Sequence, residues 1–112
     1  MDVNFETELV WLRSLSSPMR VRFLSLLSHA LTIASRLTLK GAPNEPLFVA
    51  NLTRLNEAQH QVTGYISACL NRSEHIGFLP GVVAALERAS SGPWGSQIFQ
   101  AWRSARLELG EA

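Results

Sequence analysis

The apolar residues of this chain recur every three or four positions, the spacing that places side chains on one face of an α-helix. The longest such segment runs over residues 47 to 71. Its apolar stripe consists of Phe48, Leu52, Leu55, Val62, Ile66 and Cys69. Gln59 interrupts the centre of this stripe. A buried amide without a hydrogen bond costs about 1–3 kcal/mol, so we expect Gln59 to meet a polar group across the core, an internal water or a ligand.

Serine and proline predict where the first two helices begin and end. The first helix spans about residues 5 to 15 and stops at Ser16, Ser17 and Pro18. Ser17 as N-cap, with Pro18 at the first helical position, predicts that a second helix starts here and continues to about residue 39. Its apolar residues cover nearly half of its circumference, which predicts a central helix with neighbours on two sides.

The later boundaries follow from the remaining prolines and glycines. Residues 40 to 46 predict a turn-rich connection between two antiparallel long helices, and residues 72 to 81 predict a loop. Pro80 can open a fourth helix to about Ser90, and a fifth helix runs from about Trp94 to Gly110. No segment alternates apolar and polar residues for long enough to predict a strand. The expected fold is all-α, a single domain over residues 1–112 with four to five helices built on a long antiparallel hairpin.

The composition favours association with other protein chains. Charged residues make up 17% of the chain and hydrophobic residues 46%, against a typical charged fraction of about 25%. A homodimer and a possible protein partner are therefore expected. The single cysteine and the absence of a secretory signal favour a cytoplasmic location. The uncharged stretches are shorter than the about 20 residues that a spanning helix needs, so no membrane span is expected.

A polar cluster on the third helix is the best candidate site. Its residues are Asn56, Gln59, His60 and Thr63. They could bind a ligand, form part of an interface, or bond to a facing helix and fix its register. Glu57 and His60 match the Glu-x-x-His spacing of di-iron bundles, but such a site also needs a second Glu-x-x-His and two further carboxylates, and the only other core-side candidates are Glu87 and Glu108. No metal and no cofactor are expected.

The last helix carries three large aromatic residues, Trp94, Phe99 and Trp102. So small a core cannot hold all of them without crowding. Because exposed aromatic surface commonly marks association sites, these residues are expected to form an interface.

A basic ridge on the second helix is formed by Arg22, His29 and Arg36, spaced seven residues apart. Such a ridge could contact phosphates, an acidic partner or an anionic membrane surface, or simply face water. Three positions and a net charge of +1 make a small footprint for nucleic acid, so nucleic-acid binding is not expected to be the main function.

Two stretches resemble known protein groups. Residues 15 to 27, a proline and basic residues before a leucine-rich run, resemble the opening helix of ArsR-type winged-helix repressors, which implies DNA recognition; no recognition helix or wing follows. The segments WLRSLS, RVRFLSLLSHALTIASR and LNEAQH resemble a group of small uncharacterised bacterial helical proteins. This second resemblance implies a bacterial cytoplasmic helical protein and implies no activity.

The sequence therefore favours a function by surface contact over catalysis. No histidine has a serine or cysteine at a spacing that pairs a base with a nucleophile. The leading hypothesis is a small homo-oligomeric interaction or regulatory protein. A ligand-binding or metal-binding bundle is the alternative, and a nucleic-acid-binding regulator is third. Catalytic residues can also converge from distant positions, so an enzyme stays among the alternatives.

Overall fold

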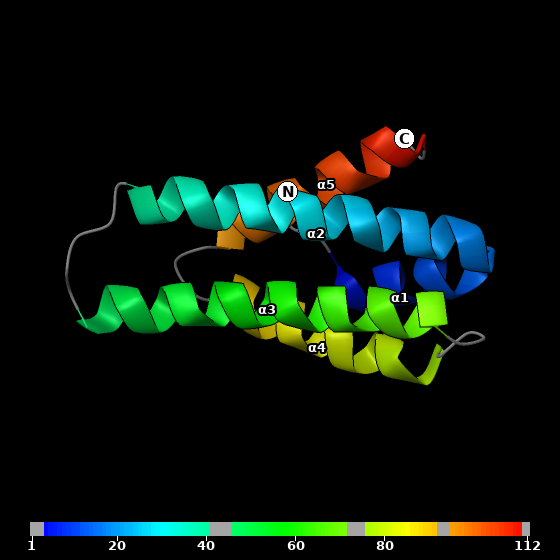
Figure 1. Ribbon diagram of the computed structural model, residues 1–112, viewed down its shortest axis with the longest axis horizontal. Helices are drawn as coiled ribbons and strands as arrows, with labels where there is room; N and C mark the ends of the chain where they lie inside the picture. The colour runs from blue at the N-terminus through cyan, green and yellow to red at the C-terminus, as the bar shows by residue number, and fades with distance from the viewer. Residues whose placement is uncertain (1–3, 41–45, 72–75, 92–94, 111–112) are drawn as a thin grey trace.

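The fold is a bundle of helices, as the sequence predicted. The computed structural model describes residues 4–40, 46–71, 76–91 and 95–110, with side chains over 4–36, 52–69, 77–91 and 95–110. These residues form α1 (Phe5–Ser14), α2 (Ser17–Lys40), α3 (Pro46–Asn71), the short 3-10 helix η1 (Ile76–Phe78), α4 (Leu79–Ser90) and α5 (Gly95–Leu109) (Figure 1). All of these elements are helical, so the all-α prediction is confirmed.

The helix ends lie close to the predicted positions. The carbonyl of Ser16 accepts the first helical hydrogen bond of α2, from the Arg20 amide at 2.9 Å, which places the N-cap one residue before the predicted Ser17. Pro80 lies in the first turn of α4, where its missing amide hydrogen is not needed. After α5, Gly110 has a φ of 95°, a left-handed conformation that suits glycine beyond a helix end.

Two of the predicted connections are only partly tested. The turn predicted over residues 40 to 46 and the helix start at Trp94 fall largely outside the described residues. Within the loop predicted over residues 72 to 81, residues 76–78 form η1 and α4 already begins at Leu79.

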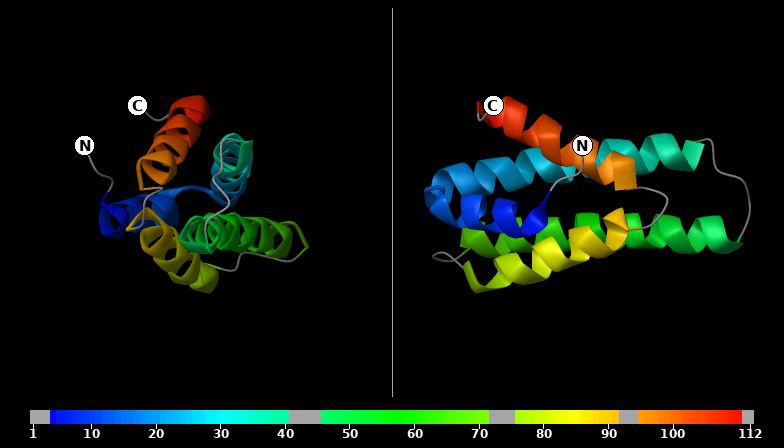
Figure 2. Two further views of the ribbon diagram at one scale, coloured as in Figure 1. Left: turned by 90° about the vertical axis from the view of Figure 1, so that its left-hand side faces the viewer. Right: turned by 180° about the vertical axis from the view of Figure 1, so that it is seen from behind.

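The helices pack in two layers that α1 closes at one side. α2 and α3 form an antiparallel hairpin, α2 also packs against α5, and α3 packs against α4 (Figures 1 and 2). The prediction of a central second helix is therefore correct. α1 lies against α4 and reaches α5 through its side chains. The molecule measures 42 × 30 × 21 Å.

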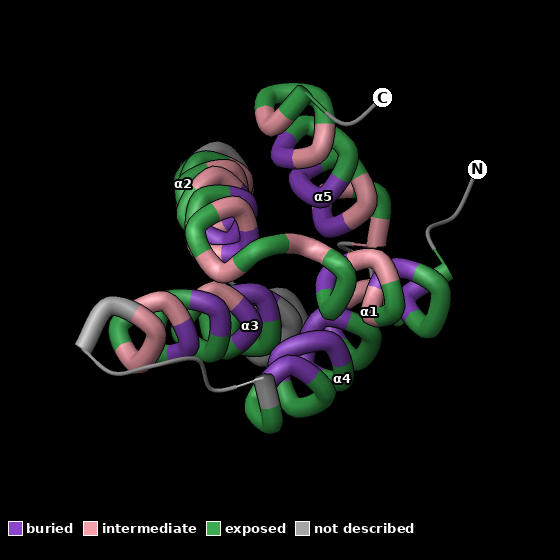
Figure 3. The backbone as a smooth tube through the Cα atoms, turned by 90° about the vertical axis from the view of Figure 1, so that its right-hand side faces the viewer, coloured by how far each residue is buried: buried purple, intermediate pink, exposed green. Residues whose placement is uncertain are grey.

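The core is centred on Trp102, which is fully buried. The Phe5 ring meets the Trp102 ring edge-on at 5.4 Å between centroids, and the Phe23 ring lies 4.9 Å from the Trp102 ring in a second edge-on contact. Edge-to-face aromatic pairs of this kind are favourable beyond the area they bury. Buried positions of all five helices line this centre (Figure 3).

Candidate functional site

An open groove runs between α3 and α4 on the outside of the bundle, and we call it the α3–α4 groove. Its first hollow has a volume of about 440 Å³. The hollow is lined by Arg54, Glu57, Ala58, His60, Gln61, Ala85, Arg88, Ala89 and Ser91. The three alanines are buried and the longer side chains around them are exposed. The groove therefore has a small apolar floor and a polar rim.

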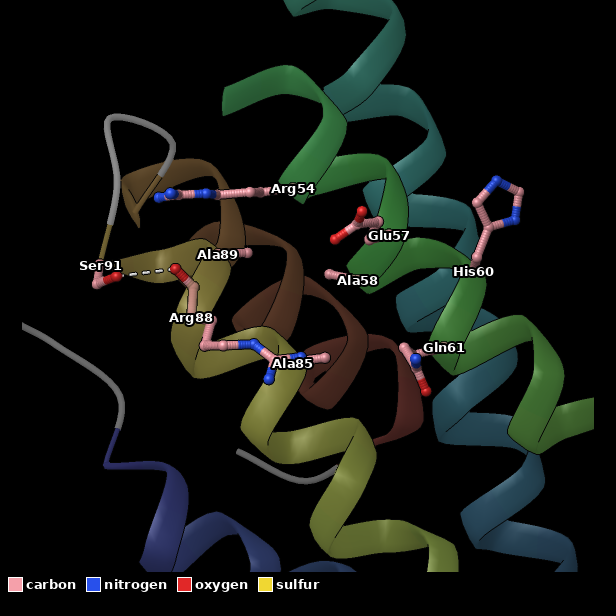
Figure 4. A pocket seen from close by; sticks show the side chains of 9 residues that line it. All are labelled: Arg54, Glu57, Ala58, His60, Gln61, Ala85, Arg88, Ala89 and Ser91. Carbon is pink, nitrogen blue, oxygen red and sulfur yellow. Dashed lines mark hydrogen bonds between the residues drawn. The ribbon is translucent and has the colours of Figure 1, made fainter. Parts of the chain in front are cut away.

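The rim of the first hollow carries charges of both signs. Figure 4 shows Arg54 reaching from α3 towards the end of α4, Arg88 reaching back towards α3, and Glu57 pointing into the space between the helices. Within the part of the chain described, none of these three side chains takes part in an ion pair. Their charges are therefore available to a partner in solution.

A second hollow of about 420 Å³ continues the groove towards the start of α4. It shares His60 and Gln61 with the first hollow and is also lined by Gly64, Tyr65, Ala68, Gly77, Phe78, Gly81 and Val82. A Cβ atom placed on Gly64, Gly77 or Gly81 would meet no atom within 4 Å. Phe78 stands at this hollow with 56% of its surface exposed. The second hollow thus combines open space with an exposed aromatic ring.

The predicted polar cluster is only partly brought together. The Gln59 amide donates to the Ser28 hydroxyl of α2 at 3.3 Å and to the Thr63 hydroxyl at 3.0 Å. The Ser28 and Thr63 hydroxyls are 2.9 Å apart. Gln59 is half-buried, so it lies at the edge of the α2–α3 contact and not in the core centre. Asn56 is exposed and joins none of these hydrogen bonds.

His60, the fourth member of the predicted cluster, is exposed and lines both hollows of the α3–α4 groove. In Figure 4 its imidazole points away from the floor of the first hollow. Gln59 and Thr63 face α2 while His60 borders α4, so the predicted cluster divides between two sides of α3. A role for these four residues in binding a ligand or a second chain stays a prediction.

The predicted basic ridge lies on the surface of the bundle. Arg22, His29 and Arg36 are all exposed on α2, and their spacing of seven residues places them along one side of the helix. Arg20, two residues before Arg22, is instead buried, with 3% of its surface exposed.

The prediction of an exposed aromatic interface is wrong for Trp102, because none of its surface is exposed. Its indole nitrogen donates to Glu8 Oε1 at 2.7 Å, which satisfies the polar atom that burial would otherwise leave without a partner. Phe99 is half-buried and packs against the core, with its ring 6.1 Å from that of Phe5. Trp94 lies outside the described residues.

Glu8 is the buried charge that sequence reasoning missed. Arg106 NH1 donates to both carboxylate oxygens of Glu8 at 2.7 Å, and the Arg106 guanidinium lies 4.1 Å from the centre of the Trp11 ring. We call Glu8, Trp11, Trp102 and Arg106 the α1–α5 clasp. The sequence does indicate that Glu8 is buried, because Glu8 lies on the same helix face as Phe5 and Leu12. Gln59 lies among its apolar neighbours in the same way.

Arg20 is a second missed polar residue, and it holds the end of α1. Its guanidinium donates to the carbonyls of Leu12 at 3.0 Å, Arg13 at 3.3 Å and Leu15 at 2.7 Å. These carbonyls belong to the last turn and end of α1, where helical amides run out; the Leu12 carbonyl also accepts from the Leu15 amide at 3.2 Å. Burial, with a smaller contribution from the Cys69 thiol, raises the pKa of Tyr65 from 10.0 to about 12, and Arg20 opposes the rise.

Two further observations concern metal binding and membrane crossing. No three His, Cys, Asp or Glu side chains among them lie close enough together to hold a metal ion. None of the described helices combines the length and the apolar character needed to cross a membrane.

No family model, curated protein or solved structure matches this chain at a significant level.

Proposed function

We propose that this chain is a small helical interaction or regulatory protein that acts in the bacterial cytoplasm as a homo-oligomer. The α3–α4 groove carries this proposal, because it is an open surface with an apolar floor and with charged side chains that form no ion pair among the described residues. The free, half-buried Cys69 fits a reducing compartment.

The shape and lining of the groove favour a helical surface as its partner. Small residues on its floor, Ala58, Ala85 and Ala89, leave space between the walls for side chains of a partner whose helices pack on them at the usual about 8–10 Å. Helix-in-groove recognition uses an apolar contact of this kind, with polar residues around it fixing the orientation. The polar rim supplies the second part.

Site-specific crosslinking tests this function. A photoreactive amino acid at Gln61, which borders both hollows, is compared with the same substitution at Gln100, an exposed residue of α5. Illumination in cells of the natural host is expected to yield a protein adduct from the Gln61 variant and none from the Gln100 variant. If neither variant forms a protein adduct, an interaction at this groove is wrong.

A small-molecule ligand is the second candidate function, and the size of the first hollow favours it. Its volume of about 440 Å³ falls in the about 300–1,000 Å³ range of ligand pockets. His60 of the predicted cluster would then contact the ligand. Mass spectrometry of the protein purified from its host under native conditions tests this alternative, because a bound molecule adds its own mass to the 12.4 kDa chain.

A further inference from the structure

We infer that the partner that packs on the α3–α4 groove is a second copy of this chain, related to the first by a two-fold axis that runs along the groove, so that the two grooves face each other. This inference rests on the proposed function, and it adds which partner binds and which residues meet. The charges on the two walls of the groove support it.

A two-fold rotation about an axis along the groove exchanges the two walls and preserves position along the axis. α3 of one copy then faces α4 of the other. Glu57 and Arg88 stand on opposite walls of the same hollow. The rotation therefore brings Glu57 of each copy opposite Arg88 of the other, and the interface contains this pair twice.

The second hollow adds a further complementary contact between the two copies. Phe78 and Gly64 line it from opposite walls, so the rotation places each Phe78 ring over the open space at Gly64 of the other copy. Phe78 exposes 56% of its surface, and a Cβ at Gly64 would meet nothing within 4 Å. An aromatic ring seated in a hollow is the usual form of an interface anchor.

Phe78 differs in this respect from the other large apolar residues that the described chain exposes. Val10, Ile33 and Leu107 lie on three different helices, and single exposed apolar side chains of this kind are normal on a protein surface. Phe78 alone among these four lines one of the two hollows.

The mixed charges of the first hollow also argue against a partner with charges of one sign. An acidic helix would meet Glu57, and a basic helix would meet Arg54 and Arg88. Like charges placed together in an interface are costly and select against such partners. A second copy presents Arg88 to Glu57 and Glu57 to Arg88.

A charge-reversal experiment tests the pairing. Glu57→Arg places two arginines opposite each other at both contacts, and Arg88→Glu places two glutamates there. Each variant alone is expected to raise the dimer dissociation constant by about tenfold or more in sedimentation equilibrium. An equimolar mixture of the two variants restores both opposite-charge pairs, so it is expected to dimerise within about threefold of the wild type.

Matched controls change the same charges away from the groove. Glu87→Arg and Arg103→Glu alter exposed residues that do not line either hollow, and neither is expected to change the dissociation constant. Circular dichroism checks that every variant is folded. Phe78→Ser is expected to weaken the dimer, and mixing it with a charge variant is not expected to restore dimerisation.

Three results would overturn the inference: a wild-type chain that sediments as a monomer, single variants that dimerise like the wild type, or weakened variants that mixing does not restore. Failure of the inference differs from failure of the proposed function. A crosslink from Gln61 to a different protein would retain an interaction function at this groove and reject the second copy as the partner there.

Discussion

The α1–α5 clasp gives the sharpest stability prediction, through Glu8→Ala. The carboxylate of Glu8 is the acceptor for the buried Trp102 indole and for Arg106. Its removal leaves the Trp102 N–H without an acceptor inside the core, which costs about 1–3 kcal/mol. A fully buried ion pair that loses one partner costs about 3–5 kcal/mol, but the Arg106 side chain is 26% exposed and recovers part of its hydration.

We therefore expect Glu8→Ala to lower the free energy of unfolding by about 2–4 kcal/mol. In a domain of this size about 1 kcal/mol corresponds to a fall of about 4 °C in Tm, so Tm should fall by about 8–16 °C. Urea unfolding followed by far-ultraviolet circular dichroism is the assay, because tryptophan fluorescence would change with the local environment of Trp102 in any case.

Two variants separate the contributions within the clasp. Glu8→Gln keeps an oxygen that can accept from Trp102 and removes the charge opposite Arg106, so we expect about half of the loss caused by Glu8→Ala. Glu6→Ala removes an exposed carboxylate from the same first turn and should cost less than about 1 kcal/mol. If Glu8→Ala costs no more than Glu6→Ala, the clasp does not stabilise the fold and the reasoning is wrong.

Three other variants test the remaining polar contacts. Arg20→Lys keeps the charge but loses the forked guanidinium that reaches three carbonyls, so it should lower the free energy of unfolding by about 2–3 kcal/mol. Arg22→Lys, on the exposed face, should lower it by less than about 0.5 kcal/mol. Equal losses would contradict the conclusion that Arg20 holds the end of α1. Tyr65 is the only tyrosine, and its pKa rises from 10.0 to about 12 on folding, so the folded state favours the neutral hydroxyl. The free energy of unfolding should therefore decrease between pH 10 and pH 12. The Tyr65→Phe variant should lack this decrease. A midpoint near pH 10 for tyrosinate absorbance in the folded protein would refute the raised pKa. Gln59→Leu should change the unfolding free energy by less than about 1 kcal/mol, because Ser28 and Thr63 keep each other as partners; a larger loss in urea unfolding would show that the amide holds the two helices together.

The helices could be predicted from sequence because their ends depend on local chemistry. Pro18 and Pro80 have a fixed φ and lack an amide hydrogen, and Gly110 tolerates a left-handed conformation, so each marks a helix end without reference to the rest of the fold. The central position of α2 followed from the width of its apolar arc, a property of one helix alone.

The clasp could not be predicted in the same way, because its bonds join residues far apart in the chain. Glu8 and Trp102 are separated by 94 residues, and helical periodicity cannot show which helix faces which. The prediction that Trp102 is exposed treated core volume as limiting and did not consider a buried acceptor for the indole. Glu8 and Arg20 each share a helix face with apolar residues, so the argument applied to Gln59 would have marked both as buried polar groups.

The α3–α4 groove was also beyond reach of the sequence. Its walls come from two helices whose pairing depends on the whole bundle, and its lining residues, such as Arg54 and Arg88, read individually as ordinary exposed side chains of amphipathic helices. His60 and Gln59 belong to one predicted cluster, yet the two residues face different neighbours of α3.

The central claim is that this chain acts by association through its surface, and a native mass spectrum of the wild-type protein purified from its host tests it most directly. The account predicts a species of twice the 12.4 kDa chain mass with no added mass. A single chain, or a chain that retains a metal ion or a small molecule, would contradict it.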